Sequence, residues 1–131
     1  MSSIKLVPVH DAPILLDRCC ELLDKEWDGK HGVHERALKH SGERDTSFAI
    51  LKSVEDEVVI GHVRLKGGGV VDLRSDAGLV LGLVVEEGHR GHGIGKMVMQ
   101  RIEEEAIRRG YGYIYLSTST AVGFYERIGY Q

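Results

Sequence analysis

The sequence predicts a single mixed α/β (α+β) domain in which a mostly antiparallel sheet is flanked by helices. Helical and strand-like spacings of apolar residues alternate along the chain, in the order β-α-(α)-β-β-β-α-β-α. The 131 residues correspond to one domain, residues 1–131, because domains run to roughly 100–200 residues. Hydrophobic residues make up 42% of the chain and charged residues 28%, a balance that favours a packed globular core.

The N-terminal part of the chain is predicted to form one strand and one amphipathic helix. Ile4–Val9 alternates apolar and polar residues, which is typical of a half-buried strand. Asp11 is the predicted N-cap of the following helix, with Pro13 tolerated in its first turn. The apolar residues of this helix recur at three- and four-residue spacing and form one stripe of Leu15, Cys19, Leu22 and Leu23. Trp27–Asp45 is polar and rich in Gly and His, with one short helix expected over His34–His40.

The middle of the chain is predicted to form three strands. Phe48–Leu51 and Val58–Leu65 are separated by a short polar segment, which is the pattern of an antiparallel hairpin. Gly67 begins a looser connection that leads to Leu79–Val85. This last strand does not alternate apolar and polar residues, so we expect it to be central with both faces covered.

The C-terminal part is predicted to form a helix, a strand and a closing helix. Apolar residues with helical spacing are Ile94, Met97, Val98, Ile102 and Ala106. Gly110 stands where a glycine C-cap is expected. Tyr113–Leu116 is the predicted strand and Thr120–Ile128 the closing helix.

Charge and hydropathy exclude several classes of function. The net charge of −3 gives no overall positive field for nucleic acid. The longest apolar stretch, Gly78–Val85, is far shorter than the ~20 residues that span a bilayer, so no membrane partner is expected. Cys19 and Cys20 are adjacent in a predicted helix, which disfavours a disulfide between them and fits a reducing compartment. We therefore expect a cytoplasmic protein.

A glycine-rich turn follows the central strand and carries the clearest functional pattern, Arg90-Gly91-His92-Gly93-Ile94-Gly95-Lys96. Glycines allow backbone N–H groups to converge on an anion at a helix N-terminus, where the helix dipole also favours negative charge. Arg90 and Lys96 add cations, so the turn predicts a phosphate or pyrophosphate site. The Walker and dinucleotide patterns do not fit the glycine spacing. A glycine-rich connection without a ligand is the alternative.

The turn resembles a known superfamily when it is combined with a second motif near the C-terminus. Leu83–Lys96, together with Phe124-Tyr125-Glu126-Arg127-Ile128-Gly129-Tyr130, is similar to the GCN5-related N-acetyltransferase (GNAT) superfamily. The resemblance implies a GNAT fold, acetyl-CoA as cosubstrate and no metal. It implies that the backbone of Leu83, Val84 and Val85 binds the pantetheine arm. It implies that the pyrophosphate is held by the amides of Arg90, Gly91, His92, Gly93, Ile94, Gly95 and Lys96. Thr118 stands where many members have an Asn near the cofactor.

The resemblance also suggests how acetyl transfer proceeds, by direct attack of an amine in a ternary complex. It places the hydroxyl of Tyr125 near the sulfur as a general acid, with a purely packing role as the alternative. His62, on the preceding strand, has a suitable pKa for a base, but a structural role or a water chain to bulk solvent are open alternatives. Leu81 stands where related actin-directed enzymes carry a carboxylate. Neither thiol is expected to act as a nucleophile.

Further stretches resemble the N-alpha-acetyltransferase 80 family within that superfamily, which acetylates processed actin. They are Leu6-Val7-Pro8-Val9-His10, Leu22-Leu23-Asp24-Lys25-Glu26-Trp27, Gly61-His62-Val63-Arg64-Leu65 and Gly129-Tyr130-Gln131. The resemblance implies an acceptor groove bordered by Trp27. Lys30 and Arg64 are candidate cations for an acidic protein N-terminus such as that of actin. The alternatives are a small amine or a lysine side chain as acceptor, and a catalytically idle acyl-CoA-binding module.

The C-terminal end differs from the superfamily pattern. Members continue into a last strand beside the closing helix, whereas this sequence stops at Gln131, so we expect its final strand to be missing. Either the chain is truncated, or a second copy completes the unpaired edge. A monomer and an edge-paired homodimer therefore both stay open.

Overall fold

The structure is a computed structural model that describes residues 4–27, 32–52, 58–67, 76–91 and 93–116. Its described strands form one five-stranded sheet in sequence order. They are β1 (Lys5–Pro8), β2 (Asp45–Leu51), β3 (Val59–Gly67), β4 (Ala77–Val85) and β5 (Tyr113–Leu116). The first four are antiparallel, and β5 is parallel to β4. The mixed, mostly antiparallel sheet predicted from the sequence is therefore confirmed.

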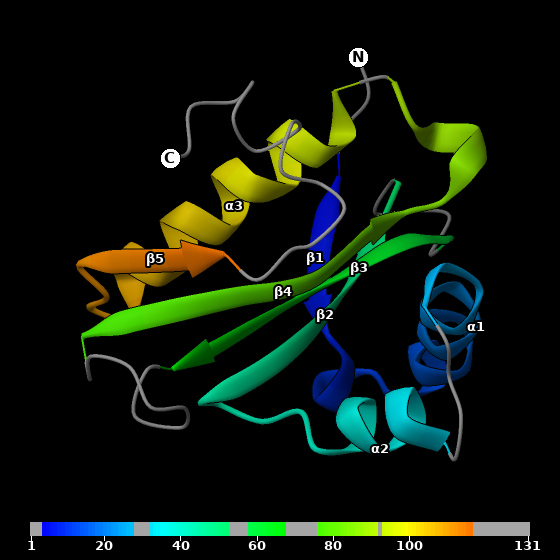
Figure 1. Cartoon of the computed structure of the whole chain (residues 1–131), viewed down its shortest axis with the longest axis horizontal. Helices are drawn as coiled ribbons and strands as arrows, with labels where there is room; N and C mark the ends of the chain where they lie inside the picture. The colour runs from blue at the N-terminus through cyan, green and yellow to red at the C-terminus, as the bar shows by residue number, and fades with distance from the viewer. Residues whose placement is uncertain (1–3, 28–31, 53–57, 68–75, 92, 117–131) are drawn as a thin grey trace.

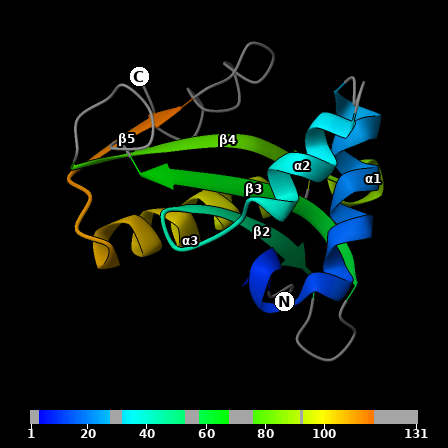
Figure 2. The ribbon, with the colours of Figure 1, turned by 90° about the horizontal axis from the view of Figure 1, so that it is seen from below.

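Helices cover both faces of this sheet (Figures 1 and 2). The α-helices are α1 (Leu16–Glu26), α2 (Val33–Lys39) and α3 (Ile94–Arg108). Short 3-10 segments are η1 (Val9–Asp11), η2 (Pro13–Leu15) and η5 (Glu87–His89). The helix α3 lies against one face, and α1 and α2 lie against the other. The predicted closing helix, Thr120–Ile128, lies outside the described residues.

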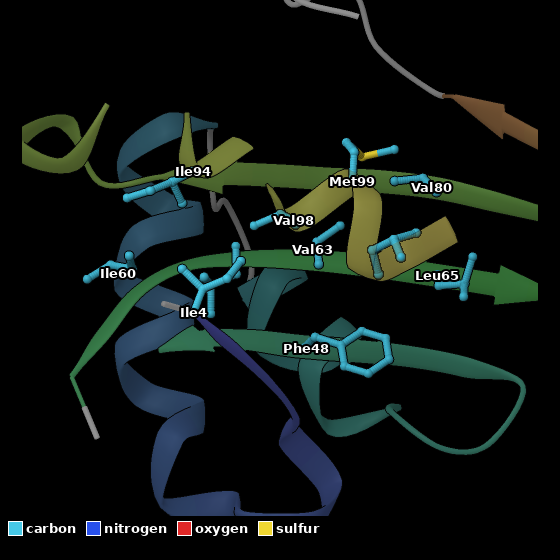
Figure 3. Close-up of a cluster of buried hydrophobic side chains, with 11 residues drawn as sticks. Ile4, Phe48, Ile60, Val63, Leu65, Val80, Ile94, Val98 and Met99 are labelled. Atoms are coloured by element: carbon cyan, nitrogen blue, oxygen red, sulfur yellow. The ribbon is translucent and has the colours of Figure 1, made fainter. Parts of the chain in front are cut away.

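Two apolar clusters hold these layers together. The α3 cluster comprises Ile4, Phe48, Ile50, Ile60, Val63, Leu65, Val80, Ile94, Val98, Met99 and Ile102 (Figure 3). The α1 cluster comprises Val9, Leu15, Cys19, Leu22, Leu23, Leu38, Ala49, Leu51, Val59 and Val84. The four-residue stripe predicted for the first helix region is buried in the α1 cluster, as expected. Among the predicted α3 positions Met97 is only partly buried, whereas Met99 is buried.

The first helix begins later than the sequence predicts. Asp11 is not its N-cap but lies in η1, and α1 starts at Leu16, which no described side chain caps. The two 3-10 turns satisfy the backbone before the helix starts: the Ala12 N–H donates to Val9 at 3.1 Å, and the Leu15 N–H donates to Ala12 at 3.0 Å. A capping carboxylate is therefore not needed at the start of this segment.

The end of α3 agrees with the predicted glycine cap. Gly110 has a positive φ of 83°. Its N–H donates to the carbonyl of Ile107, and the N–H of Tyr111 donates to that of Ala106, both at 2.9 Å. These two bonds form the Schellman arrangement that ends a helix and turns the chain toward β5.

The ladders of β3 are interrupted by two bulges. Between β2 and β3, Ile50 faces Gly61 and Leu51 faces Val59, so Ile60 is an extra residue on β3. Between β3 and β4, Val63 is opposite both Gly82 and Leu83. Gly82 has a φ of 65°, the left-handed conformation that a bulge with glycine in first position requires.

The second bulge changes which face the following β4 side chains occupy. Val80 lies in the α3 cluster, and strict alternation would place Val84 there as well. Val84 instead lies in the α1 cluster, while Leu83 and Val85 pack against the α3 cluster. The predicted coverage of both faces of this strand is confirmed.

Candidate active site

One end of β4 extends past its described pairing with β5. The β4–β5 register runs from Ala77 to Val80. Beyond it, the N–H of Glu86 donates to the carbonyl of Ile60 on β3 at 2.7 Å. Since backbone groups alternate between the two sides of a strand, Leu83 and Val85 direct theirs to the side away from β3. This edge of β4 has the geometry to receive an extended ligand as a strand-like partner.

The glycine-rich turn after η5 leads directly into α3. Gly91 and Gly93 have φ of 83° and 75°, and Gly93 is the N-cap of α3. A Cβ placed on either glycine would meet nothing within 4 Å. The first N–H groups of a helix have no acceptor within the helix, and no side chain of the described residues caps α3. The turn therefore fits a phosphate group, with N–H donors that have no described acceptor and with the positive end of the helix dipole.

The cations of this turn differ in their availability. Lys96 is exposed in the first turn of α3. The side chain of Arg90 is engaged, because its Nε donates to the Val85 carbonyl at 2.7 Å and its Nη2 donates to the Glu26 carboxylate at 2.9 Å. Its backbone N–H donates to the backbone carbonyl of Glu87 at 3.3 Å. Arg90 thus anchors the turn, and its predicted contact with the anion stays a prediction. His92 lies outside the described residues.

Two ion pairs connect α1 to the turn. Glu26 of α1 pairs with Arg90, and Arg18 of α1 forms a hydrogen-bonded ion pair with Glu86. His89 Nε2 lies 3.5 Å from the same Glu86 carboxylate. These contacts fix the direction in which the chain leaves β4. Sequence reasoning missed Glu26 and Glu86, because their partners are far away along the chain.

His62, the predicted base, lies inside the fold. It is 2% exposed, and burial is the main reason why its pKa is lowered from 6.5 to about 4. Its Nδ1–H donates to the carbonyl of Gly82 at 2.8 Å, and its buried Nε2 has no partner among the described residues. This burial and the bond to Gly82 fit the structural alternative, and a role as base stays a prediction.

The predicted acceptor-groove residues are brought together only in part. Trp27 follows the last residue of α1, and its backbone N–H donates to the carbonyl of Leu23 at 2.8 Å. Its side chain packs at the border of the α1 cluster. Arg64 is not a free cation, because it forms two hydrogen bonds with Asp45, at 2.7 and 2.6 Å, and its side chain is only 16% exposed. Lys30 lies outside the described residues, as do Thr118 and Tyr125.

A stretch of β4 that has no described partner on one side leads into a glycine-rich helix N-terminus. This arrangement fits an extended ligand with a phosphate end, as in acetyl-CoA-dependent acyltransferases. The chain belongs to the Acetyltransferase (GNAT) family, whose profile matches residues 16–130. It is thus an N-acetyltransferase domain with acetyl-CoA as its donor and an amine as its acceptor. No set of three or more His, Cys, Asp or Glu side chains in the described segments is placed to hold a metal ion. Their helices include none that is long and apolar enough to cross a membrane.

Known relatives agree with this family. The chain is 31% identical over 124 residues to N-alpha-acetyltransferase 80 of Mus musculus, covering 91% of this chain and 38% of that protein's length. Among solved structures, it resembles aminoglycoside N-acetyltransferase AAC(6')-Iy in complex with CoA, with a TM-score of 0.79, 16% identity, and coverage of 100% of this chain and 88% of the other. An acetyltransferase of the GNAT family from Staphylococcus aureus Mu50 has a TM-score of 0.77 at 15% identity, with coverage of 98% and 85%. These structural similarities establish the fold.

Proposed function

We propose that this chain transfers an acetyl group from acetyl-CoA to the α-amine of a protein N-terminus that begins with acidic residues, as in processed actin. The observation that carries the donor half is the edge of β4 beyond Val80, which has no partner strand among the described residues and continues toward the N-terminus of α3. Acetyl-CoA supplies an acetyl group activated as a thioester. The acceptor half is supported by the 31% identity to N-alpha-acetyltransferase 80.

The donor would lie along β4 and end at the glycine turn. Its pantetheine arm would bond to the backbone of Leu83–Val85 on the side away from β3, beside the hydrogen bond that the Val85 carbonyl accepts from Arg90. Its pyrophosphate would be held by the amides of Gly91–Lys96, with the Lys96 side chain adding positive charge. Arg90 would keep the turn in place through Val85 and Glu26. Thr118 is proposed near the cofactor.

The two thiols support direct attack by the amine rather than a covalent enzyme intermediate. Cys19 is fully buried, and burial raises the pKa of its thiol to about 12. For Cys20, burial and then the neighbouring Asp24 raise the pKa, and its thiol donates to that carboxylate at 3.6 Å. A thiol needs a lowered pKa to act as a nucleophile near neutral pH.

We propose a cytoplasmic location, which the two free cysteines support.

Proton transfer would use groups other than His62. Tyr125 would donate a proton to the departing thiolate, because a phenol of ordinary pKa near 10 can protonate it. The amine would lose its proton to a chain of water molecules that leads to bulk solvent. No dedicated base is required if the amine arrives neutral.

The acceptor would bind on the side of Trp27, at the end of α1. Its acidic character rests on the family resemblance, because Arg64 is neutralised by Asp45 and Lys39 is paired with Glu35 at 2.8 Å. Lys30, which directly follows Trp27-Asp28-Gly29 in the sequence, is the remaining proposed contact.

An acceptor screen tests the proposal. Release of free thiol from acetyl-CoA is measured with peptides that begin Asp-Asp-Asp, Glu-Glu-Glu, Met-Asp or Ser, with an N-terminally blocked lysine peptide and with spermidine. Selective turnover of the first two supports the proposal. Preference for the lysine peptide or spermidine replaces it with a side-chain or small-amine acetyltransferase. Binding of acetyl-CoA without turnover of any acceptor replaces it with an idle module.

A further inference from the structure

The β4 bulge carries a contact that the proposed chemistry does not use. The Nδ1 atom of His62 on β3 lies 2.8 Å from the carbonyl oxygen of Gly82, the left-handed residue of the bulge. A Cβ on Gly82 would lie 3.2 Å from Cε1 and 3.4 Å from Nδ1 of the same ring. The imidazole therefore packs directly on the bulge and bonds to it.

This contact defines the proton position on the ring. A carbonyl oxygen only accepts hydrogen bonds, so Nδ1 carries the proton and Nε2 holds the lone pair. Nε2 is buried and has no partner among the described residues. An apolar side chain in this position would pack without an unpaired nitrogen, so the contribution specific to histidine is the Nδ1–H donated to Gly82.

The bulge determines which backbone groups face the open edge of β4. With the bulge, Leu83 and Val85 direct their N–H and C=O groups away from β3, and Val84 directs its groups toward β3. Removing the extra residue from the register would exchange these two directions, because a one-residue shift inverts the alternation in a strand. The edge that would receive the ligand thus depends on the bulge being held.

We propose that His62 is a positioning residue for acetyl-CoA, which holds the Gly82 carbonyl and thereby fixes the β4 backbone of Leu83 and Val85 toward the donor. This inference rests on the proposed function, since it assumes that the donor lies along β4. It assigns the ring a role in donor binding and none in proton transfer.

Calorimetric titration of coenzyme A into four forms of the full chain tests the inference. They are the unmodified protein, His62→Leu, His62→Asn and Leu38→Ala. His62→Leu removes the donor, and the expected result is a Kd for coenzyme A that rises about tenfold, the size of one lost hydrogen bond. The amide nitrogen of Asn is the same number of bonds from Cα as Nδ1, so His62→Asn should restore the Kd to within about threefold.

The control variant separates positioning from general stability. Leu38 is 1% exposed in the α1 cluster, on α2, so Leu38→Ala should lower the melting temperature and leave the Kd for coenzyme A unchanged. The inference is overturned if folded His62→Leu binds coenzyme A as tightly as the unmodified protein, or if His62→Asn binds no better than His62→Leu. Should His62→Leu not fold, a loss of binding in His62→Asn overturns it and retained binding supports it.

A spectroscopic measurement distinguishes failure of this inference from failure of the proposed function. The imidazole ¹⁵N shifts of His62 in the unmodified protein should report a protonated Nδ1 and an unprotonated Nε2, whether or not coenzyme A binds. The opposite tautomer overturns the inference alone. Absence of coenzyme A binding to a protein with the expected tautomer overturns the proposed function, and the positioning role with it.

Discussion

Acidification from about pH 7 to about pH 5 should destabilise this protein because of His62. Burial is the main cause that lowers the pKa of this residue from 6.5 to about 4 in the folded chain. Between these two values the unfolded chain binds a proton that the folded chain does not. Stability therefore rises with pH in this window and falls as the pH drops through it.

The magnitude follows from the width of the window. A solution at about pH 5 lies about 1.5 pH units below the pKa of His62 in the unfolded chain. Each pH unit corresponds to about 1.36 kcal/mol of unfolding free energy. Moving from about pH 7 to about pH 5 should therefore remove about 2 kcal/mol from the free energy of unfolding. Glu105 does not contribute much in this range. Although burial opposes ionisation, hydrogen bonds from Arg108 and Arg109 keep its pKa lowered, so that it titrates at more acidic pH.

Urea unfolding at the two pH values measures this loss. His62→Asn removes the titrating group and should abolish most of the pH dependence. The exposed His40 offers a matched control, and His40→Asn should retain the slope of the unmodified protein. Equal unfolding free energies for the unmodified protein at both pH values would refute the reasoning, since the ring would then be accessible to protons in the folded state.

Three further predictions concern close packing, an exposed ion pair and a buried thiol. Gly61→Ala would place a Cβ 2.3 Å from a β4 carbonyl oxygen. It should destabilise the fold by at least about 1–3 kcal/mol in thermal unfolding, whereas Gly42→Ala, with open space around it, should have little effect. Glu26→Gln breaks the ion pair with Arg90, in which the Glu26 side chain is 36% exposed and the Arg90 side chain 50% exposed. Chemical denaturation should show that the free energy of unfolding changes by less than about 1 kcal/mol. A larger change would contradict the exposed character of the pair. Cys19 should resist iodoacetamide until the chain unfolds, and rapid labelling in the folded state would contradict its burial.

The described layers of the fold were predictable because they depend on local spacing. The period of the apolar residues located α1, α3 and the strands, and Gly110 correctly predicted the end of α3. The start of α1 was not predicted, since Asp11 had the chemistry of an N-cap while two 3-10 turns satisfied the backbone instead. The strand β2 begins at Asp45 rather than Phe48, in a segment where polar side chains are paired across the sheet.

The candidate site was predictable only where its chemistry lies in consecutive residues. The glycine turn could be found because glycines with positive φ stand together before an amphipathic helix. The ion pairs of Arg90 and of Arg64 could not, because Glu26 and Asp45 lie on other elements that only the folded chain brings close. An isolated glycine in an apolar strand is a known sign of a bulge, so Gly82 was the available signal for the second interruption of the ladder.

Binding of acetyl-CoA to a charge variant of the turn tests the central claim most directly. Gly93→Asp places a carboxylate at the N-cap of α3, where the account puts the pyrophosphate, and Gly93→Asn places a neutral side chain of similar size in the same left-handed conformation. The account predicts that the Kd for acetyl-CoA is more than about tenfold higher for Gly93→Asp than for Gly93→Asn, because of charge repulsion. Equal affinities for the two variants would contradict a donor site at this helix N-terminus.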